Sequence, residues 1–433
     1  MLLDYQSEHD FVVKEARFHY AGAKYEGRGF LRWQPKEGFK LDLLLKRKGP
    51  PIESYSFYWL DIPSKSDYTN LAMTLNGGFR AIIPNLYLGQ RHDIVGQDYL
   101  SLHPYRVVFL TRHHQYKDIN PCGQALLALH EQPRFEGLLE TEVKVDGKRI
   151  MSGSSVGGFS HMENGVSVVG VWDSQVKHAV TINWTIKSQK AHVQSTWKFA
   201  EALGEAIAIL SGQSVQILSR EVCGMGVLRS ELRRTREITD LGILSFFGSG
   251  TLIRKVPLVK LTLFLAKESP GAKLCRSILG HMIEAARQET NMAQELLCSM
   301  ILEAALRTLY QRPSDRRLDL QQTLRRFQND FLGGEWGEPM KRVGAAFKNL
   351  RHRNAHPNWL TTPRGAESSE NTRQAVDDKI ILSRFYGYMI LALAGFQGLK
   401  PNFPKPCQEW PPMITYGTVG EGKAFEPPPA HKG

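Results

Sequence analysis

A short basic stretch in the C-terminal third of the chain contains the residues best suited to chemistry. Residues 339–366 include no Asp or Glu, but they carry two histidines and six cationic side chains: His352, His356, Lys341, Arg342, Lys348, Arg351, Arg353 and Arg364. Such a positive field attracts a phosphodiester, and the planar guanidinium of Arg can bind two phosphate oxygens at once. The same composition is also typical of a solvated helix face, so charge alone leaves both interpretations open.

The order of residues within this stretch resembles a known motif. Arg351, His352, three further residues and His356 stand near the predicted end of a helix, and they are similar to the HEPN ribonuclease motif of Arg, a polar residue, several residues and His. The succession of a β-rich N-terminal part, a short helix and strand, and a helical C-terminal part is also similar to the ApeA family of bacterial anti-phage proteins. The resemblance implies RNA cleavage, with tRNA or another cellular RNA as substrate, under control of an N-terminal domain that senses a phage-derived trigger.

The residue types suit cleavage of RNA without a metal or cofactor. His356 can move the proton of the 2′-hydroxyl because a histidine titrates near neutral pH. Arg351 can stabilise the charge that builds on phosphorus, and His352 is the polar residue of the motif. The neighbouring polar residues are then candidates for RNA binding: Lys341, Arg342, Lys348, Arg353 and Asn354.

Helix geometry sets a condition on this assignment. Five residues at about 100° each separate Arg351 and His356 by roughly 140° on an ideal helix, so one helix cannot aim both well. Pro357 disfavours helical backbone at His356 and predicts that the helix stops there. HEPN proteins resemble one another in pairing two motifs across a homodimer, which predicts a symmetric dimer through the helical domain. The apolar stripe of the last predicted helix is a candidate interface or ordinary core: Ile381, Phe385, Tyr388, Met389 and Leu393.

Other interpretations of these residues remain open. His352 and His356 stand four residues apart, as a zinc-binding pair would, but no Glu follows His352 and the surrounding positive charge repels a dication. Both histidines can equally serve as hydrogen-bond partners at a helix end. Glu303, an acid in an otherwise apolar segment, would need a cationic partner such as Arg351 or Arg353 if buried, and it would need none if exposed.

Composition places these residues in a large, basic, globular chain. The 433 residues exceed what one hydrophobic core usually supports, which favours two domains. Residues 231–433 hold 29 Lys and Arg against 20 Asp and Glu, so nine of the twelve excess positive charges lie there and favour an acidic partner. The five cysteines stand far apart in the sequence and predict neither a disulfide framework nor a zinc knuckle.

The elements that must position the motif change in character along the chain. Short β-rich runs are predicted at 11–20, 39–45, 55–60, 106–111, 142–145 and 166–172, with hairpin turns at Asp146-Gly147 and Asn164-Gly165. A helix from the N-cap Ser195 to Gly212 and a strand at 215–218 follow. Helical periodicity then appears at 256–266, 272–287, 291–310, 318–331, 339–353 and 372–396. The segment 291–310 is apolar on nearly every face and is predicted to be the central helix.

These patterns predict an α+β chain of two domains, with an antiparallel β-rich domain at 1–235 and an all-α, HEPN-type bundle at 236–400. A Pro- and Gly-rich tail covers 401–433. Gly248-Ser249-Gly250-Thr251 lacks the spacing of a nucleotide-binding loop, and His113-His114 is an isolated pair. An acid near Met1 and the lack of a long apolar run predict a cytoplasmic protein without membrane contact. A non-catalytic protein, with the bundle as a scaffold and the β domain as a ligand-binding module, is the alternative function.

Overall fold

The computed structural model describes most of the chain in fifteen ranges. These are residues 3–20, 23–48, 68–87, 99–112, 120–132, 134–135, 139–145, 148–155, 158–173, 176–187, 193–224, 226–247, 252–310, 319–355 and 369–403. Several predicted features lie outside them, namely the strand at 55–60, the turn Asp146-Gly147, His113-His114, the glycine-rich turn 248–251 and the tail from residue 404.

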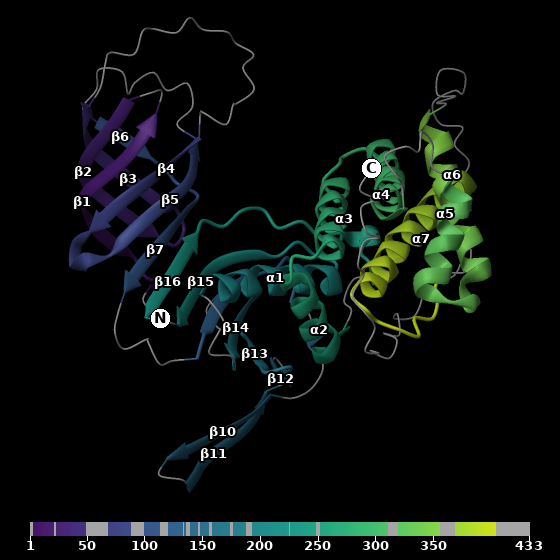
Figure 1. The fold of residues 1–433 in the computed structure, drawn as a ribbon, viewed down its shortest axis with the longest axis horizontal. Helices are drawn as coiled ribbons and strands as arrows, with labels where there is room; N and C mark the ends of the chain where they lie inside the picture. Colours follow the sequence, from purple (N-terminus) through teal and green to yellow (C-terminus); the bar gives the residue numbers. More distant parts are fainter. Residues whose placement is uncertain are drawn as a thin grey trace, which may run out of the picture.

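An antiparallel sheet of thirteen strands dominates the described part of the chain (Figure 1). From one edge to the other, the strands are β12 (Gly158–Glu163), β13 (Val166–Trp172), β14 (Ala179–Ile186), β8 (Cys122–Ala128), β15 (Gln216–Gly224), β16 (Val227–Arg233), β7 (Arg106–Arg112), β5 (Arg80–Tyr87), β4 (Tyr68–Leu75), β1 (His9–Tyr20), β2 (Ala23–Gln34), β3 (Gly38–Lys48) and β6 (Tyr99–Leu102). A separate hairpin, β10 (Leu139–Val145) and β11 (Lys148–Ser155), projects from the body, and β9 (Arg134–Phe135) pairs in parallel with β17 (Leu252–Ile253). The predicted antiparallel β-rich part is therefore present.

The strands in the middle of the sheet bury apolar side chains on both faces. In β8, Leu127 packs into a core shared with the helices, whereas its neighbour Leu126 packs into a second core among the N-terminal strands. In β7, likewise, Val108 packs into the core shared with the helices and Phe109 into the core among the N-terminal strands. Successive side chains of a strand point to opposite faces, so these strands join the two cores.

Several strands were found by sequence pattern and several were missed. The predicted runs at 11–20, 39–45, 106–111, 142–145 and 166–172 all fall within strands. Asn164 and Gly165 form the predicted turn between β12 and β13, with φ of 48° and 75°. No strand was predicted between residues 218 and 256, yet β15 continues to Gly224 and all of β16 lies there, because their charged residues interrupt the β-rich pattern.

Helix α1 (Val193–Ser211) lies against the sheet and carries the predicted apolar stripe into the core. It begins two residues before Ser195, so the prediction of Ser195 as N-cap is wrong. Gly212 follows the helix with a φ of 70° and donates its N–H to the carbonyl of Ala208, as predicted for a C-terminal glycine.

Six further α-helices follow in the described C-terminal ranges; α2 lies beside α1, and α4 to α7 gather at one end of the molecule (Figure 1). They are α2 (Lys255–Ala266), α3 (Pro270–Ala286), α4 (Asn291–Tyr310), α5 (Leu320–Phe327), α6 (Gly337–Ala355) and α7 (Ser369–Leu393). Each corresponds to a predicted helix, but the single helix expected at 318–331 is α5 followed by a π-helical turn at Gln328–Leu332. No described helix combines the length and apolar character needed to cross a membrane.

The apolar stripes of α7 and α4 differ in their burial. The stripe of α7 that was considered as an interface, including Phe385 and Met389, is buried within this chain and is ordinary core. On α4, by contrast, three apolar side chains are exposed to solvent: Met292, Leu296 and Met300. Helix α4 nevertheless contacts α3, α5, α6 and α7, as predicted for a central helix, and among the described elements only the face that carries these three side chains is left without a helix against it.

Candidate active site

Helix α6 presents the motif at its C-terminal end. Its buried face repeats at helical spacing through Met340, Val343, Phe347 and Leu350 and packs mainly against α7 and α4. The opposite face is polar, and Lys341, Lys348 and Arg351 are exposed on it. This amphipathic pattern fixes the rotation of α6 and leaves Arg351 at the surface.

Arg351 is held by a carboxylate from a different helix. Its Nη1 atom donates to Oε2 of Glu303 on α4 at 2.5 Å, and its guanidinium carbon lies 5.7 Å from the ring centre of Phe347. Arg307, one turn after Glu303, donates to the other carboxylate oxygen of Glu303 at 2.5 Å. One carboxylate thus holds two guanidinium groups, and the three-residue cluster carries a net positive charge.

Exposure of this cluster leaves room for a ligand. The Arg351 side chain is 53% exposed and Glu303 is 24% exposed. A guanidinium has five N–H donors in a planar fork, and the bond to Glu303 uses one of them. Arg351 can therefore hold its place through Glu303 and still offer donors to a phosphate.

A buried aspartate anchors α6 just before Arg351. Asp378 of α7 is buried and accepts hydrogen bonds from Nδ2 of Asn349 at 3.1 Å and from Nε2 of Gln374 at 2.9 Å. Asn349 precedes Arg351 by two residues, so this contact fixes the last described turns of α6. The sequence signal was an acid within the apolar segment of α7, which was not singled out as a partner of the motif.

The other predicted RNA-binding residues are spread along α6. Lys341 lies ten residues before Arg351, about 15 Å along the helix axis, and its Nζ donates to Glu338 at 2.8 Å. Arg342 lies near the ring of Phe403, at 5.9 Å, on a different side of the helix. Lys348 is exposed, and no ion pair of its side chain occurs within the described ranges. Of these three, Lys348 is therefore nearest to Arg351 along the helix.

The remaining motif residues are described only in part. His352, Arg353 and Asn354 lie in α6, but their side chains fall outside the described part of the structure, as does the whole of His356. The spatial relation between Arg351 and His356, the zinc-pair interpretation and the helix-end interpretation all depend on these side chains. Where side chains are described, no group of three or more His, Cys, Asp or Glu residues could hold a metal ion.

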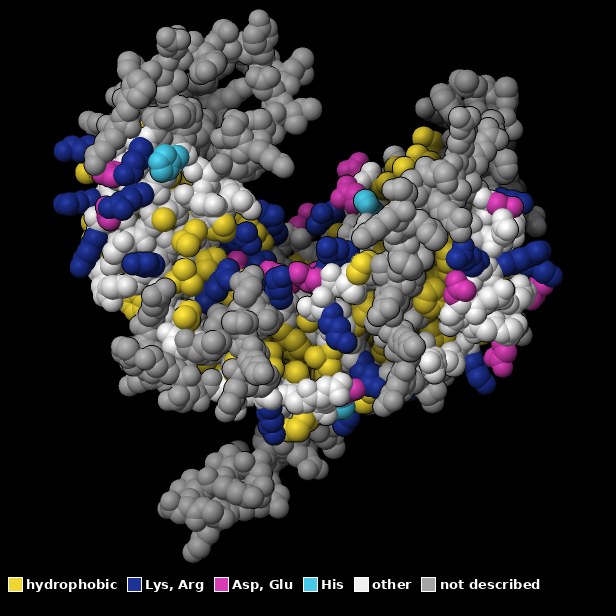
Figure 2. Space-filling model, viewed as in Figure 1, with side chains coloured by type: hydrophobic (Ala, Val, Ile, Leu, Met, Phe, Trp, Pro, Cys, Tyr) yellow, Lys and Arg dark blue, Asp and Glu magenta, His cyan; other side chains and the backbone are white. Residues whose placement is uncertain are grey.

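Acidic residues from outside the basic stretch partly neutralise its positive charge. Glu303 from α4 and Glu338 from the start of α6 each pair with a cation of the stretch, although residues 339–366 contain no acid of their own. Figure 2 shows the same mixture at the surface, where Asp and Glu are interspersed among Lys and Arg on the helical part. Among the side chains that the structure describes, the excess of positive charge in this region is therefore local to Arg351, Arg307 and Lys348.

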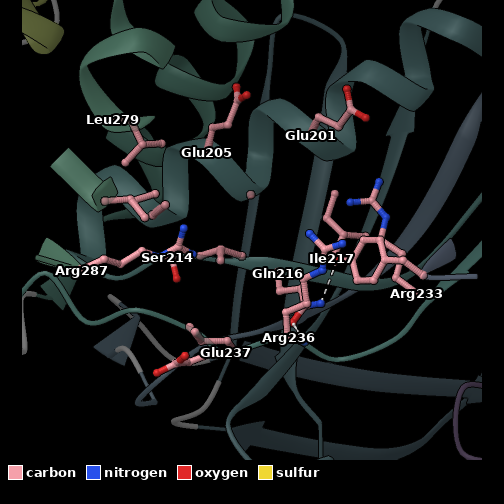
Figure 3. A pocket seen from close by; sticks show the side chains of 16 residues that line it. Glu201, Glu205, Ser214, Gln216, Ile217, Arg233, Arg236, Glu237, Leu279 and Arg287 are labelled. Atoms are coloured by element: carbon pink, nitrogen blue, oxygen red, sulfur yellow. Dashed lines mark hydrogen bonds between the residues drawn. The ribbon is translucent and has the colours of Figure 1, made fainter. Parts of the chain in front are cut away.

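A pocket that the sequence did not reveal lies between α1, α3 and the end of the sheet (Figure 3). Its volume is about 370 Å³, and its lining combines apolar residues with charged side chains of both signs: Glu201, Glu205, Glu237, Arg233, Arg236 and Arg287. Arg236 stacks on Tyr105, 3.5 Å from the ring centre, and burial raises the pKa of Glu205 although Arg276 binds its carboxylate. Because the pocket is lined by three acidic and three basic side chains, several of which already bind other residues, its charge does not favour one ligand class.

Comparison with known proteins adds no relative from which a function could be carried over. No family model, no curated protein and no solved structure matches this chain. The functional assignment therefore rests on the chain's own residues and on the motif that they resemble.

Proposed function

We propose that the protein is a HEPN-type endoribonuclease that cleaves tRNA or another cellular RNA without a metal ion. The observation that carries the proposal is the placement of Arg351. It lies at the end of α6 beside the two motif histidines in sequence, is held by Glu303 from α4, and remains half exposed. Such a pre-positioned cation is what stabilisation of a phosphorane-like transition state requires.

The proposed reaction uses the RNA's own 2′-hydroxyl as nucleophile. His356 accepts the proton of that hydroxyl, the 2′-oxygen attacks phosphorus, and the bond from phosphorus to the 5′-oxygen breaks as the 5′-oxygen takes a proton from water. Arg351 stabilises the developing negative charge, and His352 completes the motif. The products are a 2′,3′-cyclic phosphate and a 5′-hydroxyl. Nearby polar side chains bind the RNA backbone: Lys341, Arg342, Lys348, Arg353 and Asn354.

A homodimer through the helical part belongs to the proposal, and α4 supplies a better motivation for it than α7. The exposed side chains Met292, Leu296 and Met300 follow one face of α4 at a spacing of four residues. The same helix carries Glu303, the partner of Arg351, one turn farther on. A second copy on this apolar face would bring two motifs near one another, which is the arrangement that the geometry of the motif demands.

The β-rich part is proposed as the sensor of a phage-derived trigger in a cytoplasmic anti-phage response. Its support is architectural, since the β8, β14 and β15 strands share a core with the helices and thus connect the two parts mechanically. A change in the sheet can therefore reach α1 and the helices behind it.

A non-catalytic scaffold is the second candidate, and one observation favours it. The pairs from Arg351 and Arg307 to Glu303 are also what a purely structural surface cluster would form. In that case the bundle would serve dimerisation or RNA binding, and the sheet would hold the ligand.

An assay of purified protein with total tRNA in EDTA separates these functions. We expect cleavage in EDTA with 2′,3′-cyclic phosphate ends, and we expect His356→Ala to abolish it without loss of the folded state, measured by circular dichroism. His281→Ala, on the solvent-facing side of α3, is the matched control and should cleave normally. Cleavage that requires added metal, or full activity of His356→Ala, would contradict the proposed site; binding without cleavage would favour the scaffold.

A further inference from the structure

Two cysteines that are remote in the sequence meet on adjacent strands. Cys122 at the start of β8 and Cys223 near the end of β15 are directly opposite one another in the antiparallel ladder. Their sulfur atoms are 2.9 Å apart, although 101 residues separate them along the chain. Both residues are partly buried, unlike Cys275 and Cys298, which are buried in the core.

The pair lies on the sheet face that points away from the helices. Gly123, the next residue of β8, meets the ring of Trp184 on the helix side, and strand alternation therefore turns Cys122 to the other side. Neither thiol belongs to the Arg351 cluster on α6. The cysteine pair is thus a second chemical feature, independent of the proposed nuclease site.

The geometry suits a bond between the sulfurs better than a shared metal. Directly opposite residues of an antiparallel pair have Cα atoms about 4.5–5.5 Å apart, within the usual range for a disulfide. Two thiolates bound tetrahedrally to one zinc ion at about 2.3 Å each would stand roughly 3.7 Å apart. The observed sulfurs are closer than that, and a disulfide needs them to approach by less than about 1 Å.

The two thiols differ in acidity as an attacking and a resolving cysteine would. The hydrogen bond from the Cys223 thiol stabilises the Cys122 thiolate and lowers the pKa of Cys122 to about 7, against the opposing effects of burial and Glu221. The same contact raises the pKa of Cys223, which keeps its proton. Burial raises the pKa of Cys275 and of Cys298, both of which are enclosed in the core. Of these four cysteines, Cys122 therefore has the largest fraction of thiolate near neutral pH.

We infer that Cys122 and Cys223 form a reversible dithiol–disulfide site that reacts with small peroxides. The Cys122 thiolate attacks one peroxide oxygen, the O–O bond breaks, and Cys122 becomes a sulfenic acid as hydroxide leaves. The Cys223 sulfur then attacks the Cys122 sulfur, the S–O bond breaks, and the departing hydroxide takes the Cys223 proton. With hydrogen peroxide, two thiols are oxidised to one disulfide and the peroxide is reduced to two waters. A small thiol regenerates the pair by exchange.

Oxidation would join β8 to β15 in the middle of the thirteen-stranded sheet. The bond would close a loop of about 100 residues that includes β10 to β14 and α1. A cross-link of such a long loop restricts the unfolded chain strongly. The oxidised protein should therefore melt at a temperature higher by about 5 °C than the reduced protein.

The test treats the full chain with one to ten equivalents of hydrogen peroxide and maps its peptides without reduction by mass spectrometry. We expect a Cys122 to Cys223 cross-link that a reducing agent removes, together with the rise in melting temperature. Before oxidation, Cys122 should react with iodoacetamide at pH 7 more than about 100-fold faster than Cys298. Cys122→Ser and Cys223→Ser should each abolish the cross-link, whereas Cys407→Ser, in the tail, should retain it.

Other outcomes would overturn the inference. Separate oxidation of either cysteine to a sulfinic acid, a mixture of cross-links to Cys407, or equal alkylation rates for Cys122 and Cys298 would each contradict a paired site. Stoichiometric binding of zinc alone that protects both thiols, without a cross-link on oxidation, would assign a metal site instead. Because cross-linking is read in the wild-type chain, a variant that fails to fold leaves the test intact.

Discussion

Arg351 of α6 donates to Glu303 of α4 at 2.5 Å, and Glu303 also binds Arg307 one turn along its own helix. The contact joins two helices whose sequences are 48 residues apart at this point. It makes Glu303 the group that sets the direction of Arg351. This pair serves either to position Arg351 for catalysis or only to stabilise the fold, and variants of Arg351 and Glu303 can distinguish these two roles.

Replacement of Arg351 by Lys should impair RNA cleavage strongly. Lys keeps the charge but loses the planar fork, so it cannot hold Glu303 and bind two phosphate oxygens together. We expect a loss of about 100-fold or more in kcat, comparable with removal of one transition-state donor, measured in single-turnover cleavage of tRNA. Lys273→Arg, a charge-conserving change at an exposed position of α3 outside the proposed site, is the control and should cleave normally. Full activity of Arg351→Lys would show that only the positive charge of Arg351, and not its planar fork, contributes to cleavage.

Glu303→Gln should lower activity less than any change of Arg351. Gln retains the size of the side chain but loses the charge that holds both guanidinium groups, so Arg351 becomes less well positioned. We expect kcat to fall about tenfold, which corresponds to about 1.4 kcal/mol in activation free energy, with little change in KM. Glu338→Gln, which removes the exposed partner of Lys341, should remain near wild type. An unchanged kcat would indicate that the Glu303 pair serves the fold alone.

Met300→Lys should weaken self-association. Met300 is 55% exposed in the isolated chain, so the change leaves the core intact but places a charge in the apolar face of α4. We expect a dimer of the wild type at micromolar concentration in sedimentation experiments, a shift of the variant toward monomer, and a parallel loss of cleavage. Met162→Lys, a similarly exposed residue of β12, should associate normally. A wild-type monomer that cleaves RNA would refute the shared site.

Glu231→Gln should destabilise the protein, because it leaves Arg220 poorly compensated inside the structure. Glu231 on β16 accepts from Nε of Arg220 at 2.6 Å and from Nε of Arg233 at 2.8 Å, and both Glu231 and Arg220 are almost fully buried. Breaking such a pair usually costs about 3–5 kcal/mol in the free energy of unfolding. Glu201→Gln removes the exposed partner of Arg220 and should cost less than about 1 kcal/mol. Urea titrations of the two variants measure the difference.

The pH dependence of this difference has a definite sign. Burial raises the pKa of Glu231, but the charges of Arg220 and Arg233 outweigh burial and bring the pKa below its usual value of 4.5. A lowered pKa in the folded state stabilises the protein above pH 4.5, and this contribution is lost as the pH falls through the folded-state pKa. The gap between wild type and Glu231→Gln should therefore be constant above about pH 6 and should narrow below pH 4.5. A gap that widens on acidification would contradict the assignment.

Local patterns determined much of the secondary structure. Asn164 and Gly165 tolerate positive φ, and Gly212 ends α1 for the same reason, so these boundaries follow from single residues. The apolar periodicity of α3, α4 and α6 predicted those helices because one helix face must be buried whatever its partner is. Strand β16 was not predicted, since its charged residues break the β-rich pattern, and the burial of Glu231 depends on its pairing with Arg220 of the neighbouring strand β15.

Only the tertiary structure decided which similar-looking residues have different roles. The apolar stripes of α4 and α7 look alike in sequence, yet Met300 is exposed and Met389 is buried, because neighbouring helices cover one face and not the other. The sequence offered Arg351 or Arg353 as partners of Glu303, and packing of α6 on α4 selected Arg351, whereas the register of β8 and β15 placed Cys122 opposite Cys223. The sequence by itself determined the residue types and the local periods. Long-range packing determined the partners, because contacts between distant segments depend on how strands and helices are arranged rather than on spacing along the chain.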